Sequence, residues 1–194
     1  MKELIMDMEH YAQTNNVPII ELDSIKFIMK YIKLNKVKSI LEIGTAIGYS
    51  AILMANANDI CEITTIEKDE KRYKEAVKNV NRSGLDKRIE LVYNDAMNVN
   101  LSGCKYDLIF IDAAKAQNTR FFEKFEVNLE KNGTIITDNM NFHGLVEDPE
   151  TIQSRNLRAL VRKVRNYHEF LENNENYKTE FLDIGDGLAI SKPI

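Results

Sequence analysis

The stretch Tyr106-Asp107-Leu108-Ile109-Phe110-Ile111-Asp112 indicates the fold class of this chain. Its unbroken apolar run is typical of a strand covered on both faces of a parallel sheet, and it ends in an acidic residue. A second such run, Gly133 to Thr137, ends in Asp138 and Asn139, and a third, Ser39 to Ile43, ends at a glycine loop. Functional groups of open α/β sheets lie at the carboxyl ends of parallel strands. We therefore expect these three strand ends to meet at one crevice.

Strand-like and helix-like segments alternate along most of the chain, as expected for a mostly parallel α/β sheet. We expect an N-terminal helical segment, 1–35, then strands at 39–43, 62–67, 89–93, 106–111 and 133–137 and helices at about 47–57, 69–83, 118–130 and 152–173. Near the C-terminus, Asp186-Gly187 lies between strand-like runs at 177–183 and 188–191, which predicts an antiparallel hairpin at one edge of the sheet. The length of 194 residues favours one domain, 1–194.

The composition excludes several classes of protein. Hydrophobic residues make up 44% and charged residues 29%, as in ordinary globular proteins, and no apolar run approaches the roughly 20 residues that span a bilayer. The two cysteines form no C-x-x-C pair, which disfavours a disulfide scaffold or a zinc cluster. The N-terminus lacks a signal-peptide pattern, so we expect a cytoplasmic protein. The net charge of −4 argues against indiscriminate nucleic-acid binding and leaves a local basic patch possible in principle.

The glycine loop Gly44-x-x-x-Gly48 follows a buried strand and opens a helix. It matches neither the dinucleotide fingerprint nor the phosphate-binding loop, which disfavours NAD and nucleoside triphosphates. Glu67 ends the second strand, where an acidic residue can accept both hydroxyls of a ribose. The alternative is that Glu67 caps the helix that starts near Asp69. After the third strand, Asn94-Asp95-Ala96 stands where an adenine could bind, or forms an ordinary turn.

Asp112, Asp138 and Asn139 offer two carboxylates and an amide oxygen at neighbouring strand ends. An all-oxygen set suits Mg²⁺, which keeps positions open for water and substrate. The alternative is that the two aspartates are ordinary loop caps. The three histidines are scattered and supply no nitrogen-rich site.

The segment 153–168 contains five basic residues and no acidic residue. At 100° per residue it has one arginine stripe and a separate apolar face. The stripe consists of Arg155, Arg158, Arg162 and Arg165, and the apolar face of Leu157, Leu160, Val161 and Val164. Such a row fits phosphate contacts, and it equally fits a solvated charged surface.

Glu42-x-Gly44-x-x-x-Gly48, then Glu67, then Asp95-Ala96 resembles the class I S-adenosylmethionine-dependent methyltransferases. Within that group, Phe110-Ile-Asp-Ala-Ala-Lys115 with Thr137-Asp-Asn139 resembles the metal-dependent O-methyltransferases of catechol and caffeoyl-CoA. This resemblance implies a Rossmann-like fold with a seven-stranded sheet and helices on both faces. It also implies S-adenosylmethionine and Mg²⁺ or Mn²⁺ as cofactors, and a homodimer.

The resemblance also assigns roles to individual residues. Lys115 matches the catalytic lysine, acting beside Asp112, and the metal ligands are Asp112, Asp138 and Asn139. The cofactor contacts are Val17, Glu42, Gly44, Thr45, Gly48, Ser50, Glu67, Asp95, Ala96 and Asp112.

Three segments narrow the acceptor, namely Leu41 to Ser50, Ser154 to Leu160 and Gly185 to Ser191. They resemble the bacterial tRNA 5-hydroxyuridine methyltransferases, which implies methylation of the wobble base in the tRNA anticodon loop to 5-methoxyuridine. The arginine stripe would then contact RNA. Two alternatives stay open: an O-methyltransferase for small catechols or hydroxycinnamoyl compounds, and a binding module that keeps the cofactor fold without catalysis.

Overall fold

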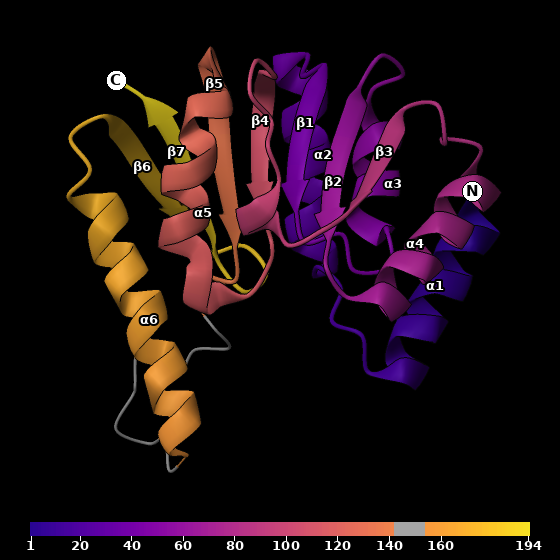
Figure 1. Ribbon diagram of the computed structural model, residues 1–194, viewed down its shortest axis with the longest axis horizontal. Coiled ribbons are helices and arrows are strands. Elements are labelled where there is room, and N and C mark those ends of the chain that lie inside the picture. The colour runs from indigo at the N-terminus through magenta and orange to yellow at the C-terminus, as the bar shows by residue number, and fades with distance from the viewer. Residues whose placement is uncertain (142–153) are drawn as a thin grey trace.

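The computed structural model describes residues 1–141 and 154–194 and shows one seven-stranded sheet in the order β3-β2-β1-β4-β5-β7-β6 (Figure 1). The strands are β1 (Ser39–Ile43), β2 (Glu62–Glu67), β3 (Ile89–Tyr93), β4 (Tyr106–Ile111), β5 (Leu129–Asp138), β6 (Tyr177–Leu182) and β7 (Leu188–Pro193). The α-helices are α1 (Lys2–Asn15), α2 (Leu22–Asn35), α3 (Tyr49–Ala57), α4 (Glu70–Ser83), α5 (Asn118–Phe125) and α6 (Arg155–Glu172). Three short 3-10 helices join them, namely η1 (Ala96–Asn98), η2 (Lys115–Gln117) and η3 (Glu126–Asn128).

Strands β1 to β5 pair in parallel, and β7 is antiparallel to both β5 and β6. The predicted α/β fold with its C-terminal antiparallel hairpin is therefore confirmed. The chain order reverses between β1 and β4, the central pair of the sheet. In open α/β sheets this switch point is where a crevice forms beyond the strand ends.

The predicted bounds of the first four strands agree with the structure, whereas two elements near β5 differ. Strand β5 begins at Leu129 rather than 133, and α5 ends at Phe125 rather than 130. Leu129 pairs with Tyr106 ahead of a register shift, so sheet pairing overrides the helical character of the sequence there. Residues 152–153 of the predicted helix 152–173 lie outside the described residues.

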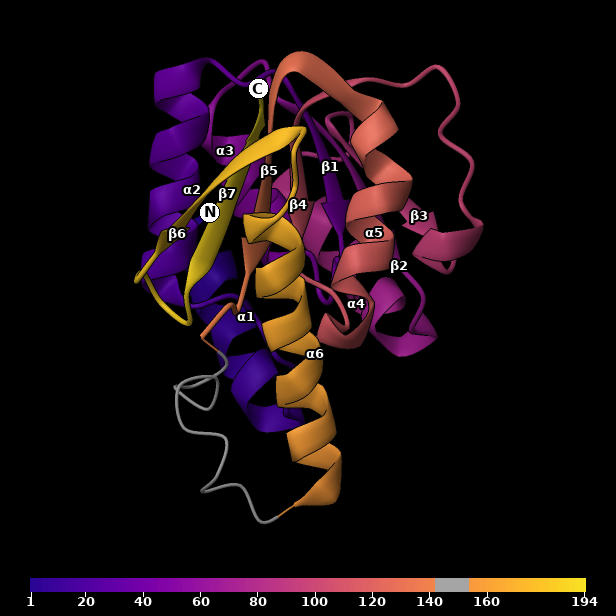
Figure 2. The ribbon, with the colours of Figure 1, turned by 90° about the vertical axis from the view of Figure 1, so that its left-hand side faces the viewer.

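Two apolar clusters cover the two faces of the sheet. One joins α1, α2 and α3 to alternate sheet residues such as Ile40 and Phe110, and the other joins α5 and α6 to their neighbours Leu41 and Ile109. Figure 2 shows α2 and α5 on opposite sides of the strands. Because successive strand side chains point to opposite faces, the continuous apolar runs of β1 and β4 are explained by burial on both sides.

Helix α6 is amphipathic, and its N-cap is Ser154, whose side chain accepts a hydrogen bond from the Leu157 amide (3.4 Å). Its buried side chains are Val161, Val164, Tyr167 and Leu171, whereas the four arginines of the predicted stripe are exposed. The first turns of α6 extend beyond the sheet (Figure 1). No helix in the described ranges 1–141 and 154–194 is long and apolar enough to cross a bilayer.

Candidate active site

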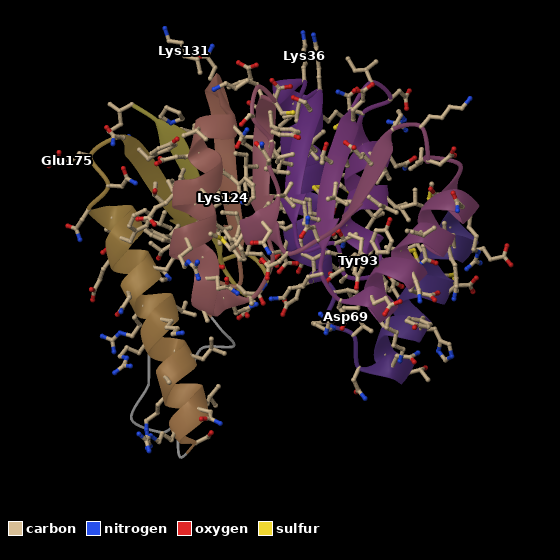
Figure 3. All side chains as sticks on the ribbon, in the orientation of Figure 1. Lys36, Asp69, Tyr93, Lys124, Lys131 and Glu175 are labelled. Atoms are coloured by element: carbon tan, nitrogen blue, oxygen red, sulfur yellow. The ribbon has the colours of Figure 1, made fainter. Side chains whose placement is uncertain are left out.

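A cavity of about 300 Å³ lies at the switch point, beyond the carboxyl ends of β1 and β4. Its walls include residues at the ends of four strands or directly after them: Gly44, Glu67 with Lys68, Asn94 with Asp95, and Asp112 with Ala113. In Figure 3, Asp69 and Tyr93 mark the carboxyl ends of β2 and β3, and Lys36 and Lys131 lie at the opposite ends of the strands. The predicted convergence of strand ends is thus present, with a volume typical of small-ligand sites.

Gly44 brings the glycine loop against the end of β4. Its φ is +103°, and a Cβ added there would lie 2.2 Å from the Asp112 carbonyl oxygen, so only glycine fits. The Asp112 amide donates to the Ile43 carbonyl (3.0 Å), which fixes the spacing of the two strand ends. A side chain at residue 44 would therefore separate the loop from Asp112.

Glu67 is held rigidly at the end of β2 by three backbone N–H groups. Its carboxylate accepts from Ala46 in the glycine loop (2.8 Å) and from Lys68 (2.9 Å) and Asp69 (2.8 Å). The N-cap of α4 is Asp69, which accepts from the Arg72 amide (2.8 Å). Glu67 therefore stabilises the turn and the loop while still lining the cavity, an arrangement compatible with ribose binding.

Asp95 and Ala96 form the wall beyond β3. Asp95 caps η1 by accepting from the Met97 amide (2.9 Å) and lies 3.5 Å from the Lys68 Nζ. The Met97 hydrogen bond, and to a smaller degree the Lys68 charge, lower the pKa of Asp95. Asp95 is therefore anionic at neutral pH and has hydrogen-bond partners of its own.

Beneath the glycine loop lies a buried polar network centred on Glu42. Its carboxylate accepts short hydrogen bonds from Ser50 Oγ and Thr65 Oγ1 (both 2.5 Å), and Thr65 Oγ1 lies 2.6 Å from Thr45 Oγ1. Burial raises the pKa of Glu42 to about 7, although the two hydroxyl hydrogen bonds oppose that shift. Glu42 supports the cavity from below, whereas Thr45 and Ser50 line it.

The predicted metal ligands lie at the ends of β4 and β5. Asp112 and Asn139 line the cavity, and Asp138 lies behind them, 2% exposed. Asp138 Oδ1 accepts a long hydrogen bond from Ser24 Oγ (3.4 Å), and its Oδ2 has no hydrogen-bond partner within the described parts of the chain. Asn139 adopts a left-handed backbone with φ of +65°.

These carboxylates carry more negative charge than the surrounding protein balances. Burial, then the neighbouring Asp112 charge, raises the pKa of Asp138 to about 7. Burial also raises the pKa of Asp112, against the opposing charge of Lys115. A buried carboxylate oxygen without a partner is costly unless a proton or a cation binds it.

The residues fit a divalent cation of the magnesium type. Two carboxylates and an amide oxygen are hard donors, and so small a set leaves positions for water and substrate. Over residues 1–141 and 154–194 no group of three or more His, Cys, Asp or Glu side chains is placed to hold a metal. The described residues therefore form no closed zinc-type cage.

Lys115 is the first residue of η2 and lines the cavity on the same side as Asp112 and Asn139. Its positive charge partly offsets the rise that burial causes in the pKa values of Asp112 and Asp138. It is therefore placed to exchange a proton with a ligand bound between these groups.

Three predicted cofactor contacts, Val17, Glu42 and Gly48, lie outside the cavity lining. Pro18, Ile19 and Ile20 line the cavity in place of Val17. The sequence reasoning missed further lining residues, Tyr49, Lys68, Arg72 and Phe121, and the buried Thr65. Arg72 and Phe121 lie in the first turns of α4 and α5, positions that no motif marked. The arginine stripe of α6 does not line the cavity.

Comparisons with known proteins identify the family. Residues 1–194 match the O-methyltransferase family. A catechol O-methyltransferase from Niastella koreensis is 30% identical over 178 residues, which cover 86% of this chain and 78% of that protein. A tapetum-specific methyltransferase from Arabidopsis thaliana is 26% identical over 179 residues, covering 89% and 77%.

Solved structures agree with this result. One is a Staphylococcus aureus protein proposed to be a caffeoyl-CoA O-methyltransferase, with 41% identity, a TM-score of 0.94, and coverage of 98% of this chain and 92% of that one. An O-methyltransferase from Bacillus cereus, solved in complex with S-adenosylhomocysteine, shares the fold at 24% identity and a TM-score of 0.83, covering 99% and 91%. The chain belongs to the S-adenosylmethionine-dependent O-methyltransferases of the caffeoyl-CoA and catechol type.

Proposed function

We propose that this chain transfers the methyl group of S-adenosylmethionine to one of two neighbouring oxygens of an acceptor, with Mg²⁺ or Mn²⁺ as an essential ion. The observation that carries this proposal is that one cavity joins Glu67 and Asp95 at one end to Asp112, Lys115 and Asn139 at the other. A nucleoside held at the first end would direct its methionine portion towards the second. Transfer of the methyl group requires the acceptor oxygen to approach in line with the bond between the methyl carbon and the sulfur. Binding the acceptor at the second end would allow that approach.

The chain's own residues then divide the work. Glu67 would bind the ribose hydroxyls. Ser50, held by Glu42, and Thr45, held by Thr65, would contact the methionine portion. Asp112, Asp138 and Asn139 would hold the cation, and a cation bound there would lower the pKa of the acceptor hydroxyl. Lys115, in its neutral amine form, would accept the hydroxyl proton. The acceptor oxygen bonds to the methyl carbon, the carbon–sulfur bond breaks, and S-adenosylhomocysteine leaves.

For the acceptor, we propose 5-hydroxyuridine at the wobble position of tRNA. Its 5-hydroxyl and 4-carbonyl form the neighbouring oxygen pair that the site requires. Support comes from α6, whose exposed arginines at 155, 158, 162 and 165 form a row on a helix that extends beyond the sheet (Figure 1). Arginine rows suit phosphate groups, and loop bases of RNA are read in protein pockets.

A small catechol or hydroxycinnamoyl compound is the second candidate acceptor, and the names of the relatives favour it. It requires no role for the arginine row. A non-catalytic module that binds S-adenosylmethionine is a third reading, which the intact set of Asp112, Lys115, Asp138 and Asn139 disfavours.

The decisive experiment incubates the protein with labelled S-adenosylmethionine and tRNA that carries 5-hydroxyuridine, with and without EDTA. Nucleoside mass spectrometry then detects 5-methoxyuridine. Product that disappears with EDTA supports the acceptor, cofactor and ion together. No product on tRNA, with transfer to a catechol, would replace the RNA proposal with the small-molecule one.

Charge reversal separates the two acceptors further. We expect Arg162→Glu/Arg165→Glu to lower the rate on tRNA by at least tenfold and to leave transfer to a catechol unchanged, since phosphate contacts supply much RNA affinity. The matched control is Lys36→Glu/Lys131→Glu. It changes the net charge equally, near the starts of β1 and β5, at the end of the strands opposite to Asp69 and Tyr93 (Figure 3). Equal losses in both double variants would contradict a specific role of the row.

A further inference from the structure

Two consecutive residues of α6 bond to the chain on either side of Asp138-Asn139. The Tyr167 hydroxyl lies 2.9 Å from Thr137 Oγ1, the residue before the pair, and both groups are buried. His168 Nε2 lies 3.0 Å from the Met140 carbonyl oxygen, the residue after the pair. One turn of helix therefore holds both flanks of the candidate metal ligands.

The chemistry of each contact is defined by its partner. A carbonyl oxygen only accepts, so His168 Nε2 carries the hydrogen and donates it to Met140. The imidazole stacks on Phe181 of β6, with centroids 4.5 Å apart and planes 18° from parallel, which fixes the direction of the N–H group. Tyr167 is likewise stacked, on Phe170, at 6.0 Å and 16°.

The segment between these contacts needs external support. Asn139 has a left-handed backbone, which costs free energy in a residue other than glycine. On the other side, the Met140 and Asn141 amides donate to the Gly187 and Asp186 carbonyls of the β6–β7 turn (3.0 and 2.8 Å). The segment from Thr137 to Asn141 is thus held between backbone groups of the β6–β7 hairpin and side chains of α6.

We propose that Tyr167 and His168 are positioning residues that hold Asp138 and Asn139 in the geometry needed to bind a divalent cation. This inference rests on the proposed function, because it requires that the pair be a metal site. Groups that orient metal ligands through hydrogen bonds commonly change metal affinity by about 10–100-fold when they are removed. Neither residue lines the cavity, so neither is expected to contact the cofactor or the acceptor.

The test measures Mn²⁺ affinity by the electron paramagnetic resonance signal of free Mn²⁺, in the full-length protein without acceptor. His168→Phe keeps a ring on Phe181 and removes the donor, and we expect Mn²⁺ binding about tenfold weaker. His168→Gln restores an N–H donor at a similar reach, and we expect affinity within about threefold of the parent protein. Tyr167→Phe removes only the hydroxyl and should give a smaller loss in the same direction.

Controls separate positioning from general destabilisation. Val164→Ala removes buried volume from the same helix without touching either hydrogen bond, so it should lower the melting temperature and keep Mn²⁺ affinity. S-adenosylmethionine affinity, measured by calorimetry in EDTA, should stay within about twofold in all variants. Parent-like Mn²⁺ binding by His168→Phe, or equal weakness of His168→Gln and His168→Phe, would overturn the positioning role.

Failure of the underlying metal proposal would look different. In that case the parent protein would bind no Mn²⁺, or Asp138→Asn would bind it as tightly as the parent. If the parent binds and Asp138→Asn does not, the metal site stands, and the α6 variants then decide the inference alone.

Discussion

The two ends of the cavity differ in how far the protein satisfies its own polar groups. One end, formed by Glu67 and Asp95, is where we propose that the nucleoside binds, and we call it the nucleoside end. There the Glu67 carboxylate accepts three backbone hydrogen bonds, and Asp95 has both an amide and a lysine partner. The other end, formed by Asp112, Asp138 and Asn139, is the proposed metal site, and we call it the metal end. There Asp138 Oδ2 has no hydrogen-bond partner within the described parts of the chain, and the pKa values of Asp112 and Asp138 are raised. The polar groups of the first end are satisfied by the fold itself, whereas the second end keeps a buried carboxylate oxygen without a partner among the described residues, as the proposed metal site requires.

This difference indicates that the two ends respond to different perturbations. Removing the ion should affect the β4–β5 end and leave the nucleoside end formed, because the hydrogen bonds of Glu67 do not involve the metal ligands. The two ends meet where Gly44 lies against the Asp112 carbonyl. Variants on either side can therefore test whether binding of the cofactor and of the ion can be separated.

The largest effect is expected from Asp138→Asn. It removes one of two carboxylates from the metal set, so methyl transfer should fall on the order of 10²–10³-fold, the range seen when an electrostatic catalytic group is lost. S-adenosylmethionine affinity should change by less than about threefold. Initial rates with saturating Mg²⁺ and calorimetric titration of the cofactor measure these two quantities.

A matched control for this change is Asp107→Asn, at the opposite end of β4, where the carboxylate accepts from the Lys38 and Ser39 amides. It should affect stability more than the transfer rate. Retained activity in Asp138→Asn would refute the metal role, and a parallel loss of cofactor affinity would show that the two ends are not separable.

Glu67→Gln should give the reverse pattern. Hydrogen bonds to a charged group contribute about 1.5–3 kcal/mol, so loss of the charge should weaken S-adenosylmethionine binding by about 10–100-fold and leave Mn²⁺ affinity unchanged. Glu90→Gln is the control, because Glu90 is an exposed carboxylate of β3 that bonds Thr64 away from the cavity. Unchanged cofactor affinity in Glu67→Gln would mean that Glu67 only stabilises the glycine loop.

The strand ends at both sides of this comparison could be predicted from the sequence. Strands buried on both faces give continuous apolar runs with sharp ends, and the parallel order places those ends at one edge. The sequence therefore predicts that Gly44, Glu67, Asp95 and Asp112 lie together, and all four line the cavity. The start of β5 at Leu129 cannot be predicted in this way, because it depends on the pairing of Leu129 with Tyr106, a contact between distant segments.

The supporting residues could not be predicted in the same way. Thr65 and Ser24 are short polar residues in apolar surroundings, and their importance comes only from the carboxylates that they meet in space. Tyr167 and His168 lie 28 and 29 residues after Asn139 in the sequence, so no local pattern connects them to it. Local signals find groups at strand ends, whereas packing decides what holds them.

The pH provides a third, smaller test of the metal end. The folded-state pKa of Asp138 is raised from 3.8 to about 7. Without metal, the folded state therefore binds the extra proton, and the free energy of unfolding should decrease as the pH rises from about 4 to about 7. Metal binding displaces that proton, so Mn²⁺ affinity should fall about tenfold per pH unit below 7.

Thermal melts in EDTA and Mn²⁺ titrations across this range measure both trends. Burial also raises the pKa of Glu42 to about 7, so Asp138→Asn is the needed control. That variant should lose the part of the pH dependence due to Asp138 and keep the part due to Glu42. An identical stability profile in the variant would show that Asp138 does not titrate as inferred.

The smallest expected effect concerns the nucleoside end and the way α5 supports it. Lys124 of α5 donates from Nζ to the Ala96 and Val99 carbonyls, both at 2.8 Å, and so fixes η1, which carries one wall of the cavity (Figure 3). Lys124→Met keeps most of the apolar stem but removes both hydrogen bonds. Lys124 acts through the position of η1 and through its charge near Asp95, and it does not line the cavity itself. S-adenosylmethionine binding should therefore weaken by about threefold to fivefold, well below the direct effect expected for Glu67.

The chain offers a close control for this variant. Lys105 donates in the same manner to the Val127 and Leu129 carbonyls (2.8 and 3.4 Å), away from the cavity. Lys105→Met should lower the melting temperature without changing cofactor affinity. Equal cofactor affinities in the two variants would mean that η1 keeps its position without the lysine, and that the nucleoside end is even more self-sufficient than its hydrogen bonds indicate.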